Sequence, residues 1–243
     1  MTINSAPPAL QPLLDRLEAA ATAEAVRFAV EDLAAANLPE AVPMLIHVLG
    51  YNNPGAAVAA VEGLIAIGEP AVMPLIALLD GFNYGARAWA LRALAGIGDP
   101  RGIDLLTQAA VEDFALSVRR AAARGLGKLQ WQGFASGDRF PAQHKALATL
   151  LQVCEDPEWV VRYAAVTGLE ALGLAWEASS DGTEAEDGAA NNAANNKADA
   201  TGRAGGRSQL QARLNSLAQT DESTALRARA TLALQRLEHS AQQ

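Results

Sequence analysis

Residues 119–129 read RRAAARGLGKL, and residues 162–172 read RYAAVTGLEAL. Each segment begins with arginine and has alanine three residues later, leucine seven residues later and leucine ten residues later. Apolar side chains at intervals of three and four line one side of an α-helix, and small alanines let a second helix approach closely. The two segments therefore predict helices that pack side by side.

Three further copies of this pattern start at Ala57, Arg87 and Arg227. Another apolar run precedes every copy, at 42–49, 72–79, 103–110, 147–153 and 210–217. Each copy is therefore predicted to be a pair of helices, and strand signals are absent. Repeats of this length stack into extended arrays, so the sequence predicts an all-α fold, an α-solenoid of about five helical-hairpin repeats.

In the last three copies an aspartate stands six residues before the arginine: Asp113, Asp156 and Asp221. This spacing resembles the HEAT repeat. The resemblance implies that the aspartate, in the turn between the two helices, bonds the arginine early in the second helix.

Uneven spacing between the copies predicts how the chain is divided. We expect N-terminal capping helices at 1–36, the HEAT-repeat solenoid at 37–176, a flexible low-complexity insertion at 177–208 and a C-terminal repeat at 209–243. The insertion is rich in asparagine, alanine and glycine, which offer little apolar surface for a core. A shorter insertion is expected at about 130–143.

Composition narrows the function classes. A formal net charge of −8 and a pI of about 4.9 argue against nucleic-acid binding, which favours a basic face. The single cysteine, Cys154, cannot form an internal disulfide, and no secretory leader is apparent, so a cytoplasmic location is expected. No apolar run reaches the roughly 20 residues of a membrane span, so no membrane insertion is expected.

No enzyme motif stands out, and His47, His144 and His239 are too scattered to predict a metal site. Cys154 lies in an apolar run, where it is either a small buried side chain or a reactive thiol. Trp131 and Trp159 lie at helix boundaries, where packing between repeats competes with a binding role.

The second helices of the middle repeats carry an unusual set of side chains opposite their apolar stripe. Arg92, Arg120, Arg124 and Tyr163 occupy that side, and Trp89 lies near Arg92. In HEAT solenoids this side is concave, and guanidinium and aromatic groups there suit a flat, conjugated dianion. Exposed arginines can also serve solubility alone, and the arginines of the repeat pattern can be purely structural.

Three segments resemble one family closely. They are 49–57 (LGYNNPGAA), 82–90 (FNYGARAWA) with 97–101 (IGDPR), and 113–127 (DFALSVRRAAARGLG). They are similar to the F-type subunit of the cyanobacterial E/F heterodimeric phycobilin lyases, strongly over about 40–132 and weakly to about 173. HEAT proteins in general share the alanines and leucines but not these motifs.

The resemblance implies a bilin lyase that works with an E-type partner of the same fold. It would bind a linear tetrapyrrole, phycocyanobilin or phycoerythrobilin, as substrate and attach it through a thioether to a cysteine of a phycobiliprotein α-subunit, or detach it. No permanent cofactor, metal or catalytic residue is implied. The adjacent His-Cys pair of isomerising members is missing here. The alternative is a non-catalytic HEAT scaffold or chaperone for phycobiliprotein subunits. The side chains expected to bind bilin are Tyr84, Arg87, Trp89, Arg92, Asp113, Arg120, Arg124 and Tyr163.

Overall fold

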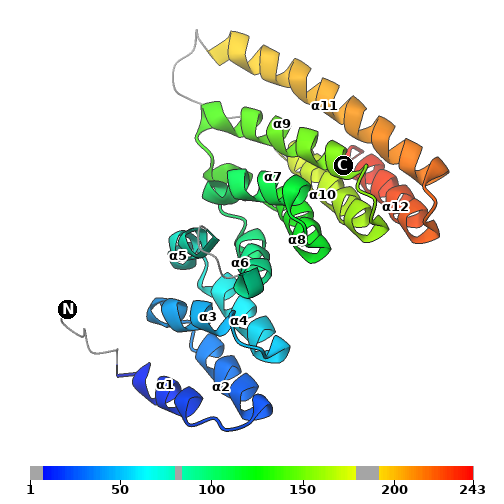
Figure 1. Ribbon diagram of the computed structural model, residues 1–243. Coiled ribbons are helices and arrows are strands. Elements are labelled where there is room, and N and C mark those ends of the chain that lie inside the picture. Colours follow the sequence, from blue (N-terminus) through cyan, green and yellow to red (C-terminus); the bar gives the residue numbers. More distant parts are fainter. Residues whose placement is uncertain (1–7, 80–83, 179–191, 243) are drawn as a thin grey trace. The chain divides into compact units, whose positions relative to one another are not determined.

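The computed structural model describes residues 8–79, 84–178 and 192–242, and all regular structure in these ranges is helical (Figure 1). The chain forms two compact units, Met1–Gly102 and Ile103–Gln243. The break between the units lies inside the segment 37–176, where the sequence predicted none. Each unit is described by itself.

The described residues of the first unit form three helix pairs. Its second helices, α2, α4 and α6, pack one against the next. The helices are α1 (Gln11–Glu18), α2 (Ala23–Ala35), α3 (Val42–Val48), α4 (Pro54–Ile67), α5 (Glu69–Leu79) and α6 (Tyr84–Ile97), with short 3-10 turns at Pro39–Ala41 and Pro100–Gly102.

Three helix pairs also make up the part of the second unit that the structure describes. Its second helices, α8, α10 and α12, again pack in sequence. The helices are α7 (Ile103–Glu112), α8 (Leu116–Gly127), α9 (Ser136–Val153), α10 (Trp159–Ala178), α11 (Asn192–Thr220) and α12 (Thr224–Ser240), with a 3-10 turn at Trp131–Gly133.

The predicted all-α repeat fold is confirmed. The alanines three residues after each pattern start are fully buried between helices: Ala60, Ala90, Ala122, Ala165 and Ala230. A methyl group in these places fills the gap between neighbouring second helices without pushing them apart. Gly68 and Gly98 end α4 and α6 with positive φ, a conformation that costs glycine least.

The α8–α10 contact is closer still, because two glycines face the opposite backbone. A Cβ on Gly127 would lie 2.3 Å from the carbonyl oxygen of Gly168, and one on Gly168 would lie 2.5 Å from the oxygen of Ala123. Any side chain larger than hydrogen would therefore force the two helices apart.

The segment predicted as a flexible insertion, 177–208, differs from the structure over most of its described part. α10 continues to Ala178, and residues 192–208 form the first half of α11; residues 179–191 lie outside the described residues. Tertiary packing overrides the weak local propensity, because Gly202 lies against Phe140 of α9 and Gly206 against Trp176 of α10. The shorter insertion is likewise taken up by the turn at Trp131 and the start of α9.

Across the residues that the structure describes, every helix is too short or too polar to cross a lipid bilayer.

Candidate functional site

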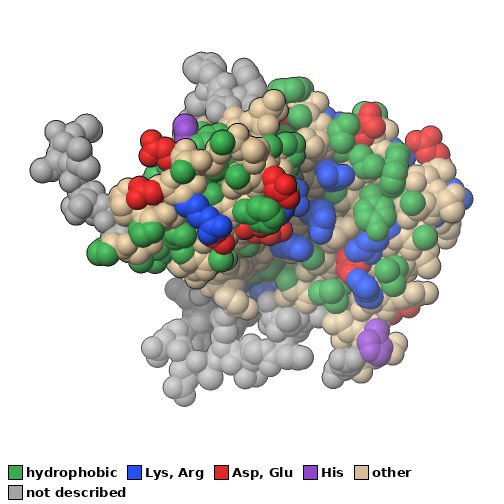
Figure 2. Space-filling model, turned by 90° about the horizontal axis from the view of Figure 1, so that it is seen from below, with side chains coloured by type: hydrophobic (Ala, Val, Ile, Leu, Met, Phe, Trp, Pro, Cys, Tyr) green, Lys and Arg blue, Asp and Glu red, His purple; other side chains and the backbone are tan. Residues whose placement is uncertain are grey.

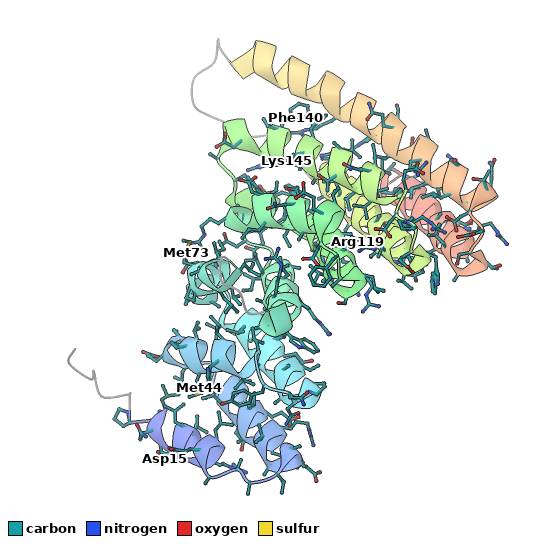
Figure 3. All side chains as sticks on the ribbon, in the orientation of Figure 1. Asp15, Met44, Met73, Arg119, Phe140 and Lys145 are labelled. Carbon is teal, nitrogen blue, oxygen red and sulfur yellow. The ribbon has the colours of Figure 1, made fainter. Side chains whose placement is uncertain are left out.

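Arginines early in the second helices of the second unit tie successive repeats together. Arg119 of α8 donates from Nη1 to the backbone carbonyl of Asp113, 2.9 Å away, in its own repeat. Its Nε and Nη2 donate to the two carboxylate oxygens of Asp156, at 2.7 and 3.2 Å, in the turn before α10. Figure 3 labels Arg119 on the second unit. The expected aspartate–arginine bond within one repeat thus uses the backbone, whereas the salt bridge joins neighbouring repeats.

The next repeat has the same arrangement. Arg162 of α10 donates to the carbonyl of Asp156 at 3.0 Å and forms a bidentate pair with Asp221, at 2.8 and 3.1 Å. In the last repeat, Arg227 donates to the carbonyl of Asp221. These bonds fix the starts of α8, α10 and α12 relative to one another, since both partners of each side-chain pair are largely buried.

We call the two side-chain pairs, Arg119–Asp156 and Arg162–Asp221, the arginine ladder. The pKa shifts of Arg119, Arg162 and Asp221 favour the charged forms. The hydrogen bonds that Arg119 donates to the Asp156 carboxylate raise the pKa of Arg119 above its usual value, and those that Arg162 donates to Asp221 do the same for the pKa of Arg162. Burial by itself would raise the pKa of the Asp221 carboxyl. The hydrogen bonds from Arg162 and from the Ser223 N–H outweigh that effect and lower the pKa.

A groove of about 680 Å³ runs across the second helices of this unit. Side chains four residues apart on a helix share one side, so each helix contributes a stripe. The lining residues are Arg120 and Arg124 from α8, Trp159, Val160, Tyr163, Ala164 and Thr167 from α10, and Ala225 and Arg229 from α12. Three of the residues expected to bind bilin, Arg120, Arg124 and Tyr163, line this groove.

The two arginines of α8 differ from the arginines of the ladder. Arg120 and Arg124 are exposed, and within the described part of the chain neither has a hydrogen-bond or carboxylate partner. Two cations one helical turn apart repel each other, so their unpaired state favours an anionic ligand between or beside them.

The α10 side of the groove is aromatic. The rings of Trp159 and Tyr163 meet edge to face, with centroids 6.4 Å apart and planes at 86°. Trp159 is 45% exposed and Tyr163 37%, which is unusual for large apolar side chains in a protein with this much core. The guanidinium of Arg229 lies 5.9 Å from the Tyr163 ring centroid. Figure 2 shows arginine and lysine side chains beside hydrophobic ones on the surface.

The remaining predicted residues lie elsewhere. Arg87, Trp89 and Arg92 belong to α6 in the first unit. There Arg87 donates to the carbonyl of Leu79 at 3.1 Å, and Arg92 lies over Trp89 at 5.7 Å. The side chain of Tyr84 is outside the described ones. Asp113 does not line the groove. Its carboxylate accepts from the Ala115 N–H at 2.9 Å, which shapes the turn before α8.

Among the groove residues that the predicted set left out are one aromatic and one cationic side chain, Trp159 and Arg229. Trp159 was assigned to packing between repeats because it opens α10, although it precedes Tyr163 by one helical turn and so continues its stripe. Arg229 lies two residues after the start of its repeat pattern, a position that the helical-wheel argument did not consider. Trp159 can be found from the sequence by extending the stripe of Tyr163 four residues toward the N-terminus. Trp131, by contrast, is buried as a packing residue.

The buried cysteine is unsuited to nucleophilic chemistry. Burial raises the pKa of the Cys154 thiol to about 11, so the thiolate needed for nucleophilic chemistry is scarce. Among the described residues no three His, Cys, Asp or Glu side chains gather as metal ligands.

Residues 72–170 match the family of HEAT repeats. The chain is 58% identical over 165 residues to "phycocyanin alpha phycocyanobilin lyase CpcF" of Synechocystis sp., which covers 68% of this chain and 77% of that protein. It is 45% identical to "phycocyanobilin lyase subunit beta" of Pseudanabaena tenuis, over 96% of this chain and 75% of that one. It is 46% identical to a "phycobilisome maturation protein" of Synechococcus elongatus, over 93% and 96%.

Two solved structures are similar to this chain. A chain of the complex of CpcE and CpcF of phycocyanin lyase from Nostoc sp. superimposes with a TM-score of 0.62 at 41% identity, covering 79% of this chain and 97% of that one. An engineered protein superimposes with a TM-score of 0.52 at 17% identity, over 96% and 98%, which shows the fold alone.

Proposed function

Because the chain belongs to the family of CpcF-type phycocyanobilin lyase subunits, we propose that it is one subunit of a bilin lyase. The enzyme binds a linear tetrapyrrole and attaches it through a thioether to a cysteine of a phycobiliprotein α-subunit. Its partner is an E-type subunit of the same repeat fold, as in the CpcE and CpcF complex to which it is similar.

In this proposal the groove of the second unit binds the bilin. Arg120 and Arg124 present two unpaired guanidinium groups, which suit the carboxylates of a tetrapyrrole through charge-assisted, bidentate hydrogen bonds. Trp159 and Tyr163 present exposed rings on the neighbouring helix α10, against which a conjugated pyrrole can stack. A groove of about 680 Å³ lies within the range that small-molecule sites occupy.

The chemistry needs no nucleophile from this chain. The acceptor thiolate adds to the exocyclic ethylidene double bond of the bilin: a carbon–sulfur bond forms, the π bond is lost, and a proton is taken up at the adjacent ring carbon. No oxidant or reductant is consumed. Cys154 is buried, with a pKa of about 11. The contribution of the groove is to hold the pigment in one orientation, so that the acceptor meets the correct carbon.

Arg87, Trp89 and Arg92 of the first unit, and separately Asp113 of the second unit, stay in the proposal as bilin contacts. Arg92 and Trp89 already pair over one surface of α6. Detachment is the reverse of the same addition, so the same groove serves both directions.

Co-expression tests the function. The chain, an E-type subunit, a phycocyanobilin source and apo-phycocyanin α-subunit are produced together, and covalent pigment is measured on denaturing gels. We expect pigment only when both lyase chains are present. Arg124→Met and Trp159→Ala should lower the attachment rate at least about 10-fold, the loss expected for a charged hydrogen bond or a stacked ring.

Lys128→Met is the matched control, because Lys128 is exposed at the end of α8 and does not line the groove. Normal attachment by folded Arg124→Met and Trp159→Ala variants would remove the groove from the mechanism. Binding of the apo-subunit without any attachment would instead establish the non-catalytic scaffold.

A further inference from the structure

One carboxylate inside the second unit holds two arginines of α12. Glu170 of α10 is almost fully buried, with 7% of its side chain exposed. Its Oε2 accepts from Nη1 of Arg229, and its Oε1 accepts from Nη1 of Arg236 at 2.9 Å. The two arginines are not equivalent, because Arg229 lines the groove whereas Arg236 does not and is 56% exposed.

Burying Glu170 is costly unless cations compensate it, and one arginine would suffice for the charge. Two guanidinium groups on a single carboxylate leave one net positive charge in this cluster. Arg229 is also held in place, since its side chain is only 9% exposed and one end of its guanidinium is fixed by Glu170. The groove thus has a fixed cation on α12, in addition to the two exposed arginines on α8.

We propose that Arg229 is a ligand-contacting residue that binds the second carboxylate of the tetrapyrrole, and that Glu170 is the positioning residue that aims it. Arg120 and Arg124 bind the first carboxylate from the opposite side. This inference rests on the proposed function and adds a specific one: the groove selects a ligand with two separated carboxylates. Guanidinium donors on both sides of an aromatic wall recognise such a ligand by charge and by spacing.

The test compares phycocyanobilin with its dimethyl ester, which has the same conjugated system but no carboxylates. Both are titrated into the full-length chain in complex with its E-type partner, and the induced circular dichroism of the pigment measures binding. The wild-type complex should bind the free acid at least about 10-fold more tightly than the ester. Arg229→Met should reduce the affinity for the acid about 10-fold and leave the affinity for the ester within about 2-fold.

Arg236→Met is the matched control, because it removes the other guanidinium from the same carboxylate and leaves the groove lining intact. It should keep the ratio of acid to ester affinities at the wild-type value. Glu170→Gln, which retains the shape of the side chain, should lower that ratio without abolishing binding. Arg229→Lys should give an intermediate ratio, since it keeps the charge and loses the planar fork; it also serves if Arg229→Met folds poorly.

The ratio does not depend on how much protein is folded, because both pigments are measured on the same sample. Equal ratios for wild type, Arg229→Met and Arg236→Met would show that Glu170 only clasps α12 to α10, and would overturn the inference. A wild-type complex that attaches phycocyanobilin and yet shows no preference for the acid would overturn this inference alone. A wild-type complex that attaches no pigment contradicts the proposed function instead.

Discussion

The carboxylate that pairs with Arg119 belongs to Asp156, 37 residues further along the chain, whereas Asp113 of its own repeat offers Arg119 its backbone carbonyl. One guanidinium thus bonds the turn of its own repeat and the turn of the following one. Arg162 repeats the relation with Asp156 and Asp221. The ladder therefore stabilises the order of the repeats in the second unit as well as each turn.

Removing one side of this ladder should be costly. In Asp156→Ala, Arg119 keeps its charge but loses its partner in a largely buried position, so we expect a loss of about 3 kcal/mol in the free energy of unfolding. The control is Asp104→Ala, which removes an exposed pair with Lys145, with 81% and 49% of the two side chains exposed. That change should cost less than about 1 kcal/mol. Urea unfolding followed by circular dichroism measures both; equal losses would contradict the structural role of the ladder.

Asp221 should make stability depend on acid pH. Because its pKa in the folded chain lies below the unfolded value, its pair with Arg162 stabilises the fold fully above about pH 4. This contribution disappears as the pH falls through the folded-state pKa. The difference in unfolding free energy between wild type and Asp221→Asn should therefore be constant near pH 7 and shrink below about pH 4. A difference that grows in acid would contradict the shift.

Glycine at 168 should be required for the contact between α8 and α10. Alanine is the better helix former, by about 1 kcal/mol, but its Cβ would lie 2.5 Å from the Ala123 oxygen. The steric clash outweighs the gain in helix propensity, so Gly168→Ala should destabilise the chain by about 1–3 kcal/mol. Gly205→Ala is the control with the opposite sign. Nothing lies within 4 Å of its added Cβ, so it should stabilise α11 by about 0.5–1 kcal/mol. Thermal unfolding measures both variants, and a Gly168→Ala variant as stable as the wild type would contradict the prediction.

Cys154 should be chemically silent in the folded protein. With a pKa of about 11, only about one thiol in a thousand is ionised at pH 8. Iodoacetamide should therefore leave the native chain unmodified and label one site after unfolding, as the chain has a single cysteine. Cys154→Ala should attach pigment like the wild type, with Lys128→Met as a reference. Rapid labelling of the native thiol would place Cys154 at an accessible site.

The sequence predicted the fold well because repetition multiplies a weak local signal. Five copies of one alanine and leucine pattern indicate paired helices more strongly than any single copy, and the buried alanines confirm it. The helix over 192–208 was not predicted, and its residues Gly202 and Gly206 lie against Phe140 and Trp176, side chains that are far away in sequence. For the candidate site, helical spacing singled out Arg120, Arg124 and Tyr163, and these three residues line one groove. Arg229 was missed, since its place in the groove depends on how α12 packs and on Glu170 of another helix.

The touching glycines of α8 and α10 have a consequence for pigment selection. The backbones of α8 and α10 are in direct contact, so no change of side-chain rotamer can alter the distance between the two helices. The helices that carry Arg124 and Tyr163 are therefore held at a constant separation. Adjustment to chromophores of different shape is then left to Arg120 and Arg124, whose long side chains are exposed.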